Sequence, residues 1–288
     1  MSKVAIVTDT SAHIPKQLVQ EYDIRLVPTL INLDNKSYRD TIDIRNPTEL
    51  FELAKKSGRF PTTSVPPPAE YVEVYRQLSQ KTDNIFSVSV TSKLSGCFNS
   101  ALQAREIIKS ELPDINIEVF DSRTTIGAMG FIVLAAARAA ASGQGMAAVI
   151  KVAEDMRSKV NMLGIFDTLS YLARSGRISK AAAMAGNMLS MKPISGISTS
   201  LGVPTVLAKP RTRQKAVRVL LEIVKQRVET ARPVHFMVEH ICAPEAAEGL
   251  KQIVQEQFNC AEVFTYEYHP VGSLIAGPGY VGLSFYQE

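Results

Sequence analysis

The sequence lacks tryptophan, has only three cysteines and four histidines, and contains no apolar run long enough to cross a bilayer. Cys97, Cys242 and Cys260 are odd in number and widely spaced, which predicts neither a disulfide framework nor a zinc site. The longest apolar segment, residues 131–141, is interrupted by Arg138, and the apolar run at residues 4–7 is too short for a signal peptide. We therefore expect a soluble cytoplasmic protein without a membrane span.

A strong excess of either charge is also missing. The 32 Lys and Arg residues against 28 Asp and Glu residues give a net charge of +4, and no basic run resembles a nucleic-acid-binding arm. Without tryptophan or clustered aromatic residues, there is no stacking platform for bases either. These absences argue against nucleic acid as a partner, and no cofactor or metal site is expected.

What is present is an ordinary globular composition, with 45% hydrophobic and 21% charged residues over 288 positions. This length predicts two domains. In the first, residues 1–158, apolar strand patterns at 4–7, 85–90 and 115–120 each precede a helix, which predicts a doubly wound, mostly parallel sheet. Ligands of such sheets lie at the carboxyl ends of the strands, where this chain places Asp9, Thr10, Ser11, Thr91, Ser92, Ser95, Asp121 and Ser122.

The central turn, TSKLSG at residues 91–96, concentrates hydroxyl groups between a strand and a helix. There, hydroxyls and free backbone N–H groups together could cradle a carboxylate or another small anion. Alternatively, Ser92 or Ser95 simply caps the helix that follows. The pattern alone leaves both interpretations open.

A second group of hydroxyls, Thr62, Thr63 and Ser64, lies between Pro61 and the prolines of residues 66–68. The prolines keep this segment extended and poor in hydrogen-bond donors. It is either a rigid connector with solvated hydroxyls or a second part of a ligand site.

The second half, residues 159–288, changes in character. Strand patterns at 193–198 and 203–208 flank a hairpin turn, and four further strands and two long helices predict an α+β domain with a mixed or antiparallel sheet. Arg174, Arg177 and Lys180 follow at steps of three, which would form one basic face if the turn at Gly176 is helical. Such a face is either solvated or a docking patch for an acidic or phosphate-bearing partner.

A small-molecule hydrolase or transferase is the enzymatic alternative. Ser92 or Ser95 would be the nucleophile, His13 or His269 the base, and Asp9 or Asp121 the orienting carboxylate. The sequence has no G-x-S-x-G motif, and its hydroxyls come in redundant clusters rather than as one unique nucleophile. A protein without catalytic activity is favoured.

Seven short motifs, in order along almost the whole chain, together resemble the DegV family of bacterial fatty-acid-binding proteins. They are TDTS at residues 8–11, PTTSVP at 61–66, TSKLSG at 91–96, FDS at 120–122, LARSGRI at 172–178, KPI at 192–194, and the segment from Pro270-Val271 through GPG at 277–279.

The resemblance implies that two domains enclose one long-chain fatty acid, such as palmitate, stearate or oleate, in a tunnel between them. Family members carry the lipid and present its carboxylate to a separate, dihydroxyacetone-kinase-like fatty-acid kinase. By resemblance, Thr63 and Ser92 contact the carboxylate, with Ser64 and Ser95 as close neighbours. The basic segment formed by Arg174, Arg177 and Lys180 corresponds to the kinase-docking region.

One position departs from the family pattern. The family commonly has a histidine four residues before the final glycine of the Gly-Pro-Gly turn, where this chain has Ile275. Either His269 or Ser273 supplies the missing polar contact, or hydroxyl groups alone hold the head group.

Overall fold

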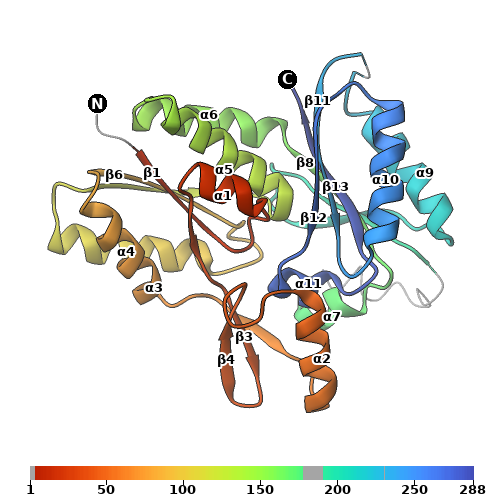
Figure 1. Cartoon of the computed structure of the whole chain (residues 1–288), viewed down its shortest axis with the longest axis horizontal. Coiled ribbons are helices and arrows are strands. Elements are labelled where there is room, and N and C mark those ends of the chain that lie inside the picture. Colours follow the sequence, from red (N-terminus) through yellow and green to blue (C-terminus); the bar gives the residue numbers. More distant parts are fainter. Residues whose placement is uncertain (1–3, 178–190, 230) are drawn as a thin grey trace.

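The first half of the chain forms a parallel sheet, as its sequence predicts. The computed structural model describes residues 4–177, 191–229 and 231–288 (Figure 1). Its first sheet has the order β2-β1-β6-β7, and all neighbouring strands are parallel. The strands are β1 (Val4–Asp9), β2 (Arg25–Val27), β6 (Asn84–Ser89) and β7 (Asn116–Asp121).

Helices cover both faces of this sheet because successive strand residues point to opposite sides. Val7 and Ile85 pack with residues of α3 (Pro68–Ser79) and α4 (Cys97–Glu111) in one apolar cluster. Ile6 and Phe86 point to the other face and pack in a cluster with α5 (Ile126–Ala141) and α6 (Met146–Lys159). A short helix, α1 (Lys16–Glu21), connects β1 to β2.

A small antiparallel sheet, of order β4-β3-β5, projects from this half. Its strands are β3 (Leu30–Leu33), β4 (Lys36–Arg39) and β5 (Thr62–Ser64), and α2 (Pro47–Ser57) follows β4. Asp34 and Asn35 form the hairpin turn with φ of 51° and 61°, and Asn46 caps α2 by accepting a 2.9 Å hydrogen bond from the Glu49 amide. The proline-flanked hydroxyls belong to a strand paired with β3 rather than to an unpaired connector.

The second half contains a six-stranded mixed sheet of order β10-β9-β8-β13-β11-β12, in which only β11 and β12 are parallel neighbours. The strands are β8 (Asn161–Ile165), β9 (Ile194–Ile197), β10 (Pro204–Ala208), β11 (Val234–His240), β12 (Cys260–Glu267) and β13 (Val281–Gln287). Helices α9 (Arg213–Lys225) and α10 (Pro244–Gln257) cover one face. The predicted mixed sheet and its hairpin are confirmed.

Helix α5 lies between the two large sheets. Most of its residues are buried, and many of them are alanine or glycine, so both sheets approach its backbone closely. Its apolar cluster also includes Met162, Phe166 and Tyr280 of the second half. The two halves thus share a continuous core, and the domain boundary near residue 158 stays a prediction.

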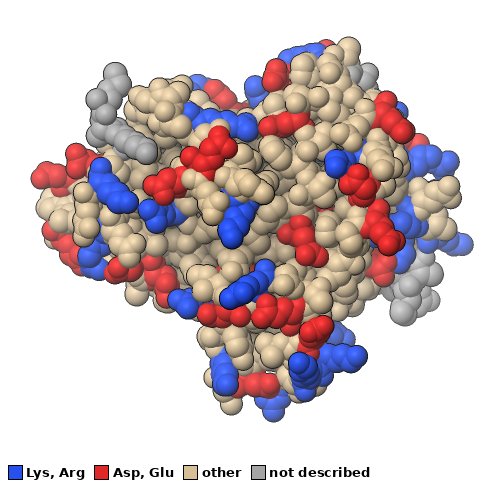
Figure 2. Space-filling model, viewed as in Figure 1, with Lys and Arg blue, Asp and Glu red and all other residues tan. Residues whose placement is uncertain are grey.

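Two short helices complete the region where the halves meet. They are α7 (Ser170–Ser175) and α11 (Pro270–Ala276), which pack against each other. None of the helices within the described residues combines the length and apolarity needed to span a bilayer. Basic and acidic side chains are interspersed over the face in Figure 2, consistent with the small net charge.

Candidate functional site

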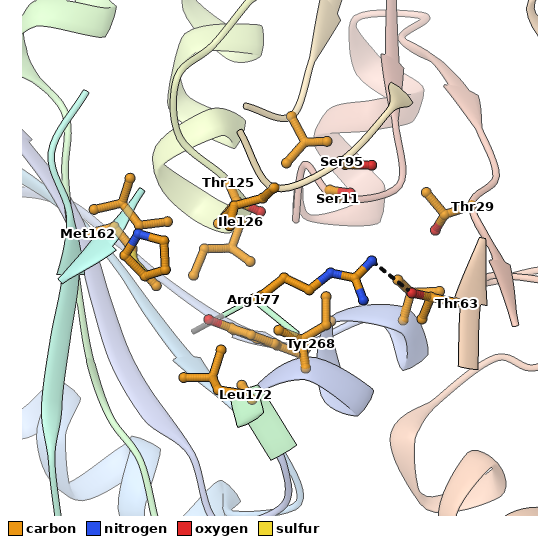
Figure 3. A pocket seen from close by; sticks show the side chains of 18 of the residues that line it. Ser11, Thr29, Thr63, Ser95, Thr125, Ile126, Met162, Leu172, Arg177 and Tyr268 are labelled. Carbon is orange, nitrogen blue, oxygen red and sulfur yellow. Dashed lines mark hydrogen bonds between the residues drawn. The ribbon is translucent and has the colours of Figure 1, made fainter. Parts of the chain in front are cut away.

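A cavity of about 320 Å³ lies where the carboxyl edge of the parallel sheet, the small sheet and the second half meet. One side of it is rich in hydroxyl groups, and the opposite side is apolar. Figure 3 shows Thr29, Thr63 and Ser95 on one side, and Met162 and Leu172 on the other. The hydroxyl-bearing residues of the lining are Ser11, Thr29, Thr63, Ser64, Ser95, Thr125, Ser195, Tyr268 and Tyr280. Such a cavity suits an elongated amphipathic molecule with one polar end.

The fold explains why hydroxyls from distant segments meet here. Ser11 follows β1 and Ser95 follows β6, and parallel strands end at the same edge of a sheet. Thr63 and Ser64 come from β5, and Thr125 immediately precedes α5. The central turn and the proline-flanked segment therefore both contribute to the cavity wall.

Arg177 places a cation at the polar end of the cavity. Helix α7 ends at Ser175, and Gly176 has φ of 74°, which turns the chain so that Arg177 Nη2 donates a 3.3 Å hydrogen bond to Thr63 Oγ1. Arg177 is half-buried, and burial lowers the pKa of its guanidinium, which remains charged because its ordinary pKa is above 12. Among the described residues it pairs with no carboxylate.

The position of Arg177 contradicts the expectation of a continuous basic face. The expectation required a helical turn at Gly176, but the glycine is left-handed and ends α7. Arg174 is exposed and lies over the Phe60 ring at 5.3 Å, whereas Arg177 turns into the cavity. Lys180 lies outside the described residues.

Ser92 and Ser95 have different surroundings. Ser92 is exposed and is not part of the cavity wall, and its backbone N–H donates to Asp121 Oδ1 at 3.3 Å. Ser95 lines the cavity, and its hydroxyl donates to Cys97 Sγ at 3.1 Å. The Cys97 amide donates weakly to Ser95 Oγ at 3.4 Å, so Ser95 has a local role at the start of α4 as well. The geometry favours Ser95 over Ser92 as a ligand contact.

The other polar residues expected at the sheet edge support the loops. Asp9 is buried and accepts hydrogen bonds from the Ser11 and Val90 amides, and burial raises the pKa of its carboxyl. Thr91 donates to the Gly202 carbonyl at 2.9 Å. Of the eight expected residues, Ser11 and Ser95 line the cavity, and the rest, Asp9, Thr10, Thr91, Ser92, Asp121 and Ser122, do not.

Neither residue expected to replace the usual histidine reaches the cavity. His269 Nδ1 donates to the Thr10 carbonyl at 2.7 Å, and its Nε2 contacts the Tyr266 hydroxyl. Ser273 is buried and donates to the His269 carbonyl at 3.0 Å. Ile275 itself contributes apolar surface to the cavity wall. The charged group at the polar end of the cavity is Arg177, which the sequence analysis had placed on a basic face instead. The one signal in the sequence is Gly176, because a glycine can end a helix in the left-handed conformation and so redirect the next residue.

The geometry does not support the hydrolase alternative. Within the described residues no histidine hydrogen-bonds to Ser92 or Ser95, and His13 is buried without a hydrogen-bond partner for either ring nitrogen. Burial lowers the pKa of His13 well below its usual range. Residues 4–177, 191–229 and 231–288 also contain no cluster of three or more side chains suited to a metal ion.

Comparisons with known proteins agree on one family. The DegV family model matches residues 3–288. A DegV domain-containing protein of Caldanaerobacter subterraneus is 36% identical over 225 residues, which cover 78% of each chain. A solved DegV family protein from Thermus thermophilus, described as binding fatty acid, superposes with a TM-score of 0.91 at 28% identity, covering 99% of this chain and all of the other. DegV from Bacillus subtilis, described as a fatty acid binding protein, superposes with a TM-score of 0.88 at 29% identity over the full length of both chains.

Proposed function

This chain belongs to the DegV family, and from that premise we propose that it binds one long-chain fatty acid in the cavity between its halves. Palmitate, stearate and oleate are ligands of the expected class. The carboxylate lies at the end with Thr63, Ser95 and Arg177, and the acyl tail extends toward Met162 and Leu172.

The observation that carries this proposal is the unpaired cation at the polar end. Arg177 is half-buried beside Thr63, lies at the hydroxyl-rich end of the cavity, and has no carboxylate partner among the described residues. A buried cation is costly unless an anion compensates it. A fatty-acid carboxylate supplies that anion, and its tail matches the remaining wall.

The hydroxyl groups are available as further contacts. Thr63 Oγ1 accepts from Arg177 and Ser64 Oγ accepts from Asn32, so both hydroxyl protons remain free to be donated to a carboxylate. Ser95 donates to the sulfur of Cys97, a weak acceptor that a carboxylate oxygen outcompetes. These three hydroxyls and Arg177 would orient the head group.

The tail provides most of the affinity. Burial of about fourteen methylene groups contributes roughly 11 kcal/mol before the cost of ordering the ligand, at ~0.8 kcal/mol each. Hydrogen bonds to charged groups contribute about 1.5–3 kcal/mol apiece. The polar end therefore determines which way round the ligand binds.

We also propose that the protein acts as a carrier, presenting the carboxylate to a separate dihydroxyacetone-kinase-like fatty-acid kinase. Arg174 is exposed in the last turn of α7, beside Phe60, and would contact the kinase. The absence of a histidine base at Ser92 or Ser95 within the described residues is compatible with a carrier that relies on another protein for chemistry.

A pair of arginine variants tests both parts. Native mass spectrometry and lipid extraction of the purified protein should find one fatty acid per chain. Arg177→Met should weaken fatty-acid binding about 10- to 100-fold in calorimetric titrations, because it removes one charge-assisted contact. Arg174→Met, the matched control, should keep the lipid but reduce phosphorylation by the kinase.

Three results would contradict these proposals. A protein that neither carries nor takes up fatty acid would refute the binding function. Equal affinities of wild type and Arg177→Met would remove Arg177 from the head-group site. Loss of bound lipid in Arg174→Met would show that this residue supports binding rather than docking.

A further inference from the structure

Thr29 is a cavity-lining residue whose hydroxyl contacts a buried carboxyl group. It lies immediately before β3, on the same side of the cavity as Thr63 and Ser95 (Figure 3). Thr29 Oγ1 lies 3.3 Å from Asp40 Oδ2 and 2.8 Å from Thr10 Oγ1. Asp40 and Thr10 do not line the cavity themselves, so Thr29 stands between them and any ligand.

The fold holds Asp40 firmly behind Thr29. Asp40 follows β4 directly and is completely buried, and its N–H donates to the Thr29 carbonyl at 2.9 Å. Asp40 Oδ1 accepts a 3.1 Å hydrogen bond from the Val271 amide in α11. The carboxyl group is therefore fixed from both sides, with its second oxygen directed at the Thr29 hydroxyl.

No cationic side chain neutralises Asp40. The titratable groups that face it are His269, at the start of α11, and Tyr266 of β12. Among the described residues, it forms no ion pair with a lysine or an arginine. Burial raises the pKa of this carboxyl, although His269 and the hydrogen bonds act in the opposite direction. A change of charge in its surroundings can thus shift the carboxyl between its ionised and neutral forms.

The protonation state of Asp40 decides where the Thr29 hydroxyl donates its proton. An ionised carboxylate only accepts hydrogen bonds, so Thr29 then donates to Asp40 and turns a lone pair toward the cavity. A protonated Asp40 instead donates to Thr29 Oγ1, which frees the Thr29 proton for a ligand. In both states Thr29 Oγ1 keeps a lone pair that can accept from the Thr10 hydroxyl.

We infer that Thr29 is a further contact for the ligand carboxylate, and that Asp40 is a positioning residue that takes up one proton when the ligand binds. The inference rests on the proposed fatty-acid binding. With Asp40 ionised, a bound carboxylate would meet a lone pair of Thr29 and a second negative charge behind it. A proton taken from the solvent by Asp40 removes this charge and reverses the Thr29 hydroxyl, which then donates to the ligand.

Proton uptake during binding tests this inference. Calorimetric titrations with palmitate, in buffers of different ionisation enthalpy and at intervals from pH 6 to pH 9, give the number of protons taken up. Asp40→Asn reproduces the neutral carboxyl at every pH, because its amide can donate to Thr29 and its carbonyl can accept from Val271. In part of this range wild type should take up more protons than the variant, with a difference of up to about one. There its affinity, relative to that of the variant, should fall by at most about 10-fold per pH unit. The ionisation of palmitate and of His269 is common to both chains.

Three further variants locate the effect. Asp43→Asn neutralises a neighbouring but exposed carboxylate, the partner of Arg39, and should keep the proton uptake of wild type. Thr29→Val removes the hydroxyl and nearly keeps the shape of the side chain. It should weaken palmitate binding roughly 5- to 10-fold and reduce proton uptake to that of Asp40→Asn. Thr29→Ser restores a hydroxyl and should recover both.

The outcomes separate this inference from the proposed function. If wild type does not bind palmitate, both fail. If wild type binds palmitate but takes up as many protons as a folded Asp40→Asn at every pH, fatty-acid binding stands and the role of Asp40 is overturned. A loss of thermal stability in that variant would then identify Asp40 as a purely structural residue. If Asp40→Asn does not fold, Thr29→Val takes its place in the comparison, and equal proton uptake by wild type and Thr29→Val overturns the inference.

Discussion

Glu239 makes the stability of this protein depend on pH in a direction that can be worked out. Its carboxyl is fully buried, and burial outweighs the hydrogen bonds from Gly127 and Ser284, which raises its pKa from 4.5 to about 8. The native protein therefore holds this carboxyl protonated at neutral pH, whereas the unfolded chain ionises it. Each unit of pH between these two values favours the unfolded state by about 1.4 kcal/mol.

Glu239→Gln removes this dependence. Glutamine has no proton to lose, yet its carbonyl can accept from Gly127 and its amide can donate to Ser284. The free energy of unfolding of the variant, relative to that of wild type, should rise between pH 4.5 and about pH 8. Above pH 8 the difference between the two proteins should stay constant. The full gain is about 5 kcal/mol, or roughly 8 °C in melting temperature for a protein of this size.

Thermal unfolding of the lipid-free proteins at intervals from pH 4.5 to pH 9 measures this gain. The difference between the two melting temperatures is the informative quantity, because every other titrating group is common to both chains. Two curves that stay parallel over the whole range would refute the reasoning, since they would show that Glu239 ionises alike in the folded and unfolded states.

Two further predictions concern the central turn and the thiols. Ser95→Ala should weaken fatty-acid binding roughly 5-fold through loss of one hydroxyl contact, whereas Ser92→Ala should leave calorimetric affinity unchanged; equal losses would contradict the assignment. A thiol reagent should label exposed Cys242 first and half-buried Cys260 later. Cys97 should stay unlabelled until unfolding, because burial raises the pKa of its thiol. Mass spectrometry that finds early labelling of Cys97 would argue against its buried position.

The overall architecture could be predicted because it follows from local patterns. Strands alternating with helices specify a parallel sheet, and the hairpin turn at residues 199–202 specifies antiparallel neighbours. Asn46 followed by Pro47 and Glu49 is a local signal of the same kind for the start of α2. These signals need no knowledge of distant residues.

The parts that could not be predicted depend on distant contacts. Thr62–Ser64 forms a strand because it pairs with β3, which is distant in the sequence. The prolines on both sides argue against a strand when the sequence is considered alone. The spacing of Arg174 and Arg177 suggests one face, but a left-handed Gly176 sends the second side chain inward. Ser92 and Ser95 are the same residue type in the same turn, so the sequence cannot tell which of them lines the cavity. The backbone path of the turn decides that it is Ser95.

Helix α5 contributes to the apolar packing of both halves, and this limits how far the protein is modular. A chain cut near residue 158 would leave this helix with one face covered and the other, built for the second sheet, exposed to water. Neither half is then a unit that could be exchanged with a relative or fused to another protein by itself. For protein engineering, the whole chain is the smallest unit that can be transplanted.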